Sequence, residues 1–378
     1  MKRIILISCI IGQSLSFVGT GGFHVSPVLF WIMYLNLFHT RKRTLYSLLP
    51  LIGYTLLVSL TQFSNTDYFE FLKSLIYFIS FFLVFFNSQI NNPTLGYNHL
   101  RSVIAISVLL IFGFEIIQVF EHVVLKSNST LFLLSDFSIS TAQNAGRFEA
   151  VNLLGYIRPL SFFHEPSYLG STLLVLLLCL DNLEVPKSGK LIKVLCILGI
   201  LFSISITNYI GLLIYFLWIK RKDRFSIILK YFLISFGLVS SSVLVSFLRL
   251  DEILLRGSSA WARIILPIEA IEYEIFSNYA LFGRSLGNTS IIFDNSFFLI
   301  ICYFGFLTPI FYYYVYKQSL PEIVADKSIL LGLMVLFFLN GAIFTPESSF
   351  LLSLIIMTIK LKSQKNLKIR IKKTEQPI

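Results

Sequence analysis

Residues Arg158–Gly170 read Arg-Pro-Leu-Ser-Phe-Phe-His-Glu-Pro-Ser-Tyr-Leu-Gly and stand directly before the apolar run from Ser171 to Leu180. A guanidinium, an imidazole and a carboxylate thus lie within eight residues of an otherwise apolar region. Because the residue before a proline avoids the α region, we expect Arg158 and Glu165 at breaks or helix starts. The stretch therefore predicts a bent approach to a membrane helix, with its charges at the bilayer surface.

The composition of the 378-residue chain is that of an integral membrane protein. Hydrophobic residues make up 56% of it and charged residues only 13%, whereas soluble domains average about 45–50% and about 25%. The net charge is +11. The lysines and arginines stand in short clusters between apolar runs, as the positive-inside rule requires, and are not gathered on a soluble domain. We therefore expect a lipid bilayer, and no nucleic acid, as the partner of these charges.

Apolar runs and basic loops alternate along the whole chain. A helix needs roughly 17–25 apolar residues to cross a bilayer, and Lys and Arg mark the cytoplasmic loops. Starting inside at Lys2-Arg3, we predict an all-α polytopic domain over residues 1–378, with about twelve crossings, both termini in the cytoplasm and a basic tail at 361–378. The predicted crossings are 4–18, 23–38, 45–63, 69–86, 102–120, 166–180, two short helices between Lys193 and Lys220 hinged near Ser205–Tyr209, 225–247, 295–316, 329–344 and 350–359.

Two large extracytoplasmic loops, at residues 121–165 and 249–294, are too long to be simple turns. Loops of such length in a compact protein are usually functional. The second loop contains no lysine, and its arginines run against the positive-inside bias. These arginines are Arg249, Arg256, Arg263 and Arg284. We therefore expect a ligand on the outer face that binds guanidinium groups.

The arginines of the second loop have the chemistry of a phosphate-binding site. Guanidinium groups bind phosphate bidentately, unlike the point charge of lysine, so converging arginines make a diphosphate clamp. Arg256 and Arg263 are seven residues apart and share one face if the segment is helical. The alternative is that these arginines bind lipid phosphates or pair with acids of the same loop, namely Glu269, Glu272 and Glu274.

Two carboxylates are candidate general bases. Asp294 could deprotonate a sugar hydroxyl, although Asp294 and Asn295 also open a predicted helix, where either could serve as the N-cap. Glu165 lies at a predicted helix start, where the helix dipole favours a negative charge without any chemistry. Its neighbour His164 is either a second proton carrier or an interfacial histidine. No metal cluster, P-loop or dinucleotide fingerprint is present in the sequence, so we expect neither a metal nor a cofactor.

These motifs resemble the O-antigen polymerase and ligase superfamily, which includes the Wzy-type polysaccharide polymerases. Arg158–Ser167 is similar to the family's Arg, spacer and Glu-Pro-Ser/Asn pattern, and Ser258–Arg263 to its Ser/Gly-rich stretch ending in arginine. Asn278–Gly287, followed by Asp294-Asn295 and Tyr303–Gly305, is similar to the family's Asn-Pro-Leu, Gly-x-Gly, His-Asn and closing Gly pattern. The resemblance covers residues 145–310.

The chain departs from the family pattern at three places. Asp294 stands where ligases of the superfamily carry a histidine, which favours a polymerase over a ligase. Thr207–Tyr209 replaces the usual Ser-Arg-Gly/Ala, so no cation is available there, and the proline expected after Asn278 is missing.

The resemblance implies a metal-independent, inverting glycosyltransferase of the bacterial cytoplasmic (inner) membrane. It would transfer a growing glycan from undecaprenyl diphosphate onto a lipid-linked repeat unit, making O-antigen, capsule or exopolysaccharide, with a chain-length regulator and a flippase as partners. Arg158 and Arg263 would bind the diphosphates, Arg256 and Arg284 would help, and Asp294 or Glu165 would be the base. A leaving diphosphate needs a metal or several arginines, and the sequence offers arginines.

Two other functions remain open at this point, an O-antigen ligase and a flippase or transporter of lipid-linked oligosaccharide. A transporter would need charged residues within its membrane helices. Glu115 is the main residue of that kind in the sequence.

Overall fold

The computed structural model confirms the helical class that the sequence predicts. The residues that it describes are 6–7, 10, 19–20, 23–24, 28, 30–32, 34, 42–62, 66–86, 97–127, 152–153, 156–157, 161, 163, 166–183, 189–203, 205–220, 259–288, 295–319, 326–339 and 346–374. Four described helices are long and apolar enough to cross a membrane: Lys42–Thr61, Tyr68–Phe86, Asn98–Leu125 and Phe297–Gln318. A polytopic membrane protein agrees with these helices, and the total of about twelve crossings stays a prediction.

The chain divides into two compact units. The first comprises Met1–His39, Gln89–Tyr209 and Ser349–Ile378, and the second Thr40–Ser88 and Ile210–Ser348. Two short antiparallel strand pairs lie in the first unit: β1 (Gly19–Thr20) with β2 (Phe23–His24), and β3 (Asn152–Leu153) with β4 (Tyr156–Ile157). The first pair falls at the turn expected after the first crossing, and the second pair ends directly before Arg158.

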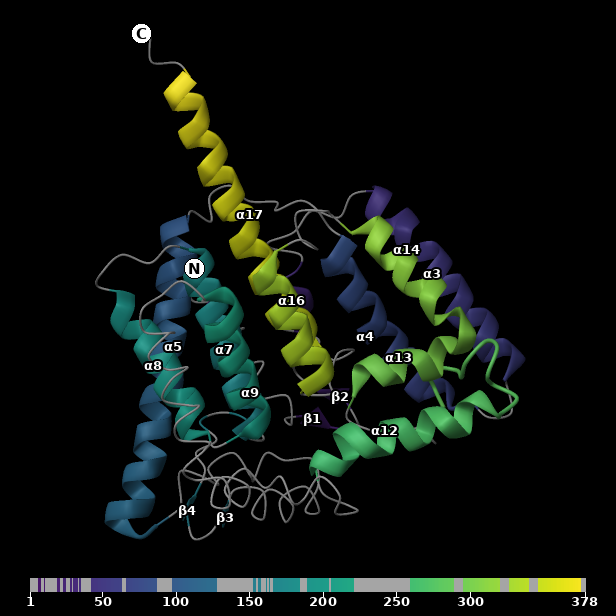
Figure 1. Ribbon diagram of the computed structural model, residues 1–378, viewed down its shortest axis with the longest axis horizontal. Helices are drawn as coiled ribbons and strands as arrows, with labels where there is room; N and C mark the ends of the chain where they lie inside the picture. Colours follow the sequence, from purple (N-terminus) through teal and green to yellow (C-terminus); the bar gives the residue numbers. More distant parts are fainter. Residues whose placement is uncertain are drawn as a thin grey trace. The chain divides into compact units, whose positions relative to one another are not determined.

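The first unit is built around α7 (Pro166–Asn182), which packs against α5 (Tyr97–Phe120) and α8 (Lys190–Phe202) (Figure 1). Every residue of α7 from Leu169 to Leu180 is buried, as expected of a helix that is apolar on all sides. The motif stretch at 158–170 therefore leads directly into the centre of this unit.

Two helices of the first unit extend past their predicted ends. A π-helical turn, η3 (Glu121–Leu125), continues α5, so the first five residues expected in the outer loop are helical. Helix α17 (Pro346–Thr374) joins the last predicted crossing to most of the basic tail. Asn182 at the end of α7 donates a hydrogen bond to Thr358 of α17, 3.4 Å away.

The second unit has an aromatic core between α3 (Lys42–Thr61), α4 (Tyr68–Phe86) and a broken helix. The predicted crossing at 295–316 is divided into α13 (Ser296–Phe304), a 3₁₀ turn η8 (Gly305–Leu307) and α14 (Thr308–Gln318). Gly305 has a φ of 52° and Pro309 lacks an N–H, so the α-helical ladder is interrupted there. Across the break, Phe304 stacks on Phe311 with ring centroids 4.0 Å apart, and Tyr54 stacks on Phe304 at 5.1 Å.

The remaining described elements include a predicted pair of short helices and a helix within the predicted second loop. The predicted pair of short helices between Lys193 and Lys220 is present as α8 and α9 (Ile206–Ile214), which a π-helical turn η6 (Tyr215–Ile219) continues. The second unit also contains α12 (Ser259–Ile275), which packs against α13, and α16 (Lys327–Leu333) with η9 (Met334–Leu339). The predicted crossing at 225–247 and most of those at 4–18 and 23–38 lie outside the described residues.

Candidate active site

The segment 158–170 is fixed at Ser161 by a glutamine from a neighbouring helix. Gln118 of α5 accepts a hydrogen bond from the Ser161 N–H at 2.8 Å and donates one to the Ser161 carbonyl at 3.1 Å. The Ser161 hydroxyl donates to the carbonyl of Ile111 at 2.9 Å. Ser161 is buried and has a φ of 51°, which residues other than glycine rarely adopt. These three hydrogen bonds therefore hold a bend in the middle of the stretch.

The start of α7 is fixed by Asn208 of α9. The Asn208 amide donates to the Ser167 carbonyl at 2.9 Å and accepts from the Ser171 hydroxyl at 3.2 Å. A Cβ on Gly170 would come within 2.6 Å of the Asn208 side-chain carbon Cγ, so only glycine leaves room for this buried asparagine. The bonds at Ser161 and Ser167 lie on either side of Glu165. Arg158, His164 and Glu165 themselves lie outside the described residues.

The turn at 277–288 in the second unit depends on Gly283. This residue has a φ of 73°, and a Cβ there would come within 2.6 Å of the Phe304 backbone nitrogen. Gln62, next to the end of α3, donates to the Gly283 carbonyl at 2.8 Å and accepts from the Ser285 N–H at 3.0 Å. The Arg284 N–H donates to the carbonyl of Cys302 at 2.8 Å. As at Ser161, a glutamine side chain fixes this turn by donating one hydrogen bond and accepting another.

Arg284 forms an ion pair with Glu274. Its Nη2 lies 2.6 Å from Glu274 Oε1, and both side chains are largely buried. The guanidinium also lies over the ring of Tyr279, 4.4 Å from the centroid. Of the pairings that we considered from the sequence, the one with Glu274 is therefore present for Arg284. The Glu274 carboxylate therefore neutralises part of the positive charge of Arg284, which we predict to bind a diphosphate.

Arg263 lies in α12, so the segment is helical from Ser259 onward. Eleven residues, or three helical turns, separate Arg263 from Glu274, so the two positions lie on one side of α12 and about 16 Å apart along its axis. The structure does not bring Arg263 and the partner of Arg284 close together. Arg256 lies outside the described residues.

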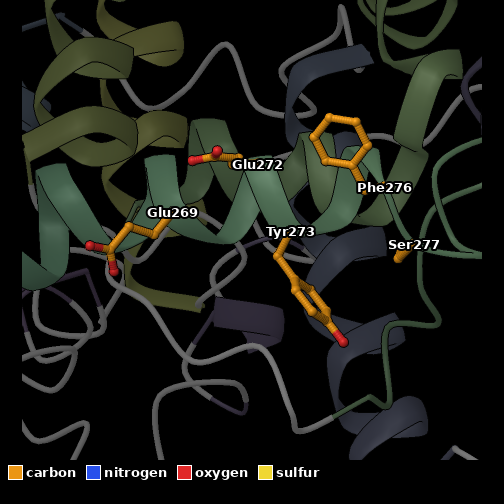
Figure 2. A pocket seen from close by; sticks show the side chains of 5 residues that line it. All are labelled: Glu269, Glu272, Tyr273, Phe276 and Ser277. Atoms are coloured by element: carbon orange, nitrogen blue, oxygen red, sulfur yellow. The ribbon is translucent and has the colours of Figure 1, made fainter.

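An open pocket of about 400 Å³ lies on the side of α12 opposite Arg263 and Glu274. Figure 2 shows the side chains that line it, which come from the last two turns of α12 and the two residues that follow. They are Glu269, Glu272, Tyr273, Phe276 and Ser277.

The N-cap of α13 is Asn295, whose side chain accepts a hydrogen bond from the Phe298 N–H at 3.4 Å. The capping role that we considered for the Asp294-Asn295 pair therefore falls to the asparagine. Asp294 lies outside the described residues. Within the described part of the chain, no three His, Cys, Asp or Glu side chains are grouped so that they could hold a metal ion.

Glu115 is buried in the first unit, where α5 meets α8. Its side chain is completely inaccessible to solvent, and within the described residues neither carboxylate oxygen has a hydrogen-bond partner. A Cβ on Gly199 of α8 would come within 2.6 Å of Glu115 Oε2, so the glycine provides the space for the carboxyl. This acid lies within a candidate membrane span, where unpaired polar groups are costly.

Sequence reasoning did not find the residues that hold the two motifs: Gln62, Gln118 and Asn208. Each is an amide within or next to an apolar helix, where a polar side chain needs a hydrogen-bond partner. The free-energy cost of an unpaired buried amide thus marks these three residues in the sequence as candidates for a structural role. It does not identify their hydrogen-bond partners.

The apolar spans, together with polar motifs fixed by side chains in or next to apolar helices, define a helical membrane protein with candidate catalytic segments next to its helix ends. Residues 1–361 match the model of the family described as WcaD colanic acid polymerase. The chain belongs to this family, which is one of Wzy-type polysaccharide polymerases. It is therefore a membrane polysaccharide polymerase of the glycosyltransferase type. None of the curated proteins and none of the solved structures matches the chain.

Proposed function

We propose that the protein elongates a bacterial polysaccharide at the outer face of the inner membrane. The donor is a growing glycan on undecaprenyl diphosphate, and the acceptor is a lipid-linked repeat unit of an O-antigen, capsule or exopolysaccharide. Membership of the polymerase family is the observation that carries the proposal. With both termini in the cytoplasm, the loops at 121–165 and 249–294 face these substrates.

The transfer is a single displacement that inverts the anomeric carbon and needs no metal. An acceptor hydroxyl oxygen attacks the anomeric carbon, and its proton passes to the carboxylate of Asp294 or Glu165. The bond from that carbon to the diphosphate oxygen breaks, and the diphosphate leaves with the electron pair. Arg158 and Arg263, helped by Arg256 and Arg284, stabilise the leaving charge.

The geometry of α12 supports separate binding of two diphosphates. Arg263 lies near one end of the helix, and Arg284 is tied to the other end through Glu274. A separation of about 16 Å along the helix axis gives each end of α12 room for its own diphosphate. We assign the donor diphosphate to Arg263 and the acceptor diphosphate to the end near Arg284, whose guanidinium is partly neutralised and therefore holds an anion more weakly.

Polymerisation in a host lacking its own copy of the gene tests this proposal. Arg263→Ala should reduce long-chain product by about 10²–10³-fold, as expected for the loss of one group that stabilises a developing anion. Arg263→Lys should restore little, because lysine cannot bind bidentately. Lys73→Ala, which removes a surface ion pair with Glu70, is the matched control. Normal product length from Arg263→Ala at equal protein level would refute the assignment.

The base and the metal requirement are tested with purified protein and a lipid-linked repeat unit. Asp294→Asn and Glu165→Gln each remove one candidate base, and only the loss of the true base should abolish turnover. Activity that survives a chelator supports metal-independent transfer, and activity that returns only with added divalent cation contradicts it.

A further inference from the structure

Helix α12 has two chemically different sides. Pro267 and Glu274, on one side, are buried, and Glu274 is paired with Arg284. Glu269, Glu272 and Tyr273, at spacings of three and four residues, share the other side. Phe276 and Ser277 follow the last helical residue and complete the lining of the pocket. We call Glu269, Glu272, Tyr273 and Phe276 the acid–aromatic face.

Among the described residues, the acid–aromatic face is exposed. Tyr273 is 69% exposed and Phe276 86% exposed. Within the part of the chain that the structure describes, neither Glu269 nor Glu272 takes part in an ion pair or hydrogen bond. Figure 2 shows the two carboxylates and the two rings around one open pocket of about 400 Å³.

Carboxylates and rings at these positions select the class of ligand. An ionised carboxylate only accepts hydrogen bonds, so its partner must carry O–H or N–H donors. Two neighbouring carboxylates repel a phosphate or an acidic sugar. Exposed rings offer flat apolar surfaces for the C–H faces of a ligand. Neutral sugar rings, with several hydroxyl donors and apolar faces, meet both requirements.

Membrane contact explains these residues less well. A helix that lies on a bilayer presents apolar residues and cations to the anionic headgroups, whereas this face presents two acids. Two other exposed apolar residues of α12, Ile268 and Ile275, are seven residues apart and lie on a separate flank. That flank is the part of α12 suited to lipid contact.

We propose that the acid–aromatic face binds neutral sugars of the acceptor repeat unit, along α12 between the two ends to which we assign the diphosphates and on the opposite side of the helix from Arg263 and Glu274. The proposal rests on the proposed function, since it deepens the same site. The face extends over about 10 Å from Glu269 to Phe276, which is longer than one sugar ring. It holds the repeat unit by its glycan part, whereas the arginines hold it by its diphosphate.

Binding of a glycan that lacks the diphosphate tests this inference separately. The probe is the repeat-unit oligosaccharide released from the host's own polymer, titrated against the full-length protein in nanodiscs and followed by saturation-transfer NMR. The Glu269→Gln/Glu272→Gln variant and the Phe276→Ala variant should each bind it at least about tenfold more weakly, since charge-assisted hydrogen bonds and ring contacts each contribute that much. Ile268→Ala, the matched control on the other flank, should bind it like the wild type.

Binding of inorganic diphosphate should not weaken in the Glu269→Gln/Glu272→Gln variant, and Arg263→Ala should still bind the oligosaccharide. The inference is overturned if the wild type does not bind the oligosaccharide, if the glutamine variant binds it equally well, or if Ile268→Ala loses as much affinity. If the oligosaccharide binds as expected while Arg263→Ala polymerises normally, the assignment of Arg263 fails and the sugar site stands.

Discussion

Replacing Gly283 with alanine should unfold the turn that carries Arg284. An alanine at a φ of 73° costs about 1–2 kcal/mol in backbone strain alone. Its Cβ would also contact the Tyr303 carbonyl group and lie 2.6 Å from the Phe304 nitrogen. These are backbone atoms within α13, so they cannot rotate away as a side-chain end could.

The turn must therefore move away from α13, and its hydrogen bonds break. The bond from the Arg284 N–H to Cys302 and the bond from Gln62 to the Gly283 carbonyl are each 2.8 Å long, and each contributes about 1 kcal/mol. Together with the backbone strain, the loss in free energy of unfolding is about 3–4 kcal/mol. For a chain of this size we expect the melting temperature to fall by on the order of 4–5 °C.

Thermal unfolding of the detergent-solubilised protein, followed by the fluorescence of a fused reporter in size-exclusion chromatography, measures this effect. Gly113→Ala in α5 is the matched control, because no described atom beyond its chain neighbours and its own helix backbone lies within 4 Å of its added Cβ. A helical alanine there should leave the melting temperature unchanged or raise it. A Gly283→Ala protein that melts together with the wild type would refute the reasoning.

Two further variants test the first unit. Gln118→Ala removes the side chain that pairs with the buried N–H and carbonyl of Ser161, so we expect the free energy of unfolding to fall by about 2–4 kcal/mol. The control Ile117→Ala, at an exposed neighbouring position, should change the melting temperature little. Equal melting temperatures of the two variants would contradict the role of Gln118 at Ser161. Within the described residues the carboxylate oxygens of Glu115 accept no hydrogen bond, and Glu115→Gln keeps the size of the side chain. The variant should therefore melt at or above the temperature of the wild type and still polymerise. A folded variant that makes no product would show that turnover needs the carboxyl group.

The long apolar helices could be read from the sequence because hydrophobicity along a single run decides them. Helices α3, α4 and α7 begin and end within a few residues of their predicted bounds. The division of the tenth predicted crossing at Gly305 was not foreseen, since one glycine within an apolar run often continues a helix. Its φ of 52° arises from packing against the turn at Ala280, which is distant in sequence.

The sequence predicts which types of residue form the candidate site, but not which of these residues pair with one another. Arginines in a predicted outer loop indicate ion pairs or phosphate binding, yet nothing local distinguishes Glu274 from Glu269 or Glu272 as the partner of Arg284. The bond between Gln118 and Ser161 joins residues 43 positions apart. Such contacts depend on how helices pack, which hydrophobic periodicity does not specify.

Because Gly170 and Asn208 fit closely together, a substitution at one of these two positions constrains which residue the other can carry. Any side chain larger than hydrogen at position 170 occupies the volume of the asparagine, so the two substitutions must be acquired together or in a permissive order. A designer who grafts the 158–170 motif onto another polymerase would therefore have to transfer position 208 with it. The motif is local in sequence, but the smallest part of the protein that can be exchanged without a clash includes residues from two helices.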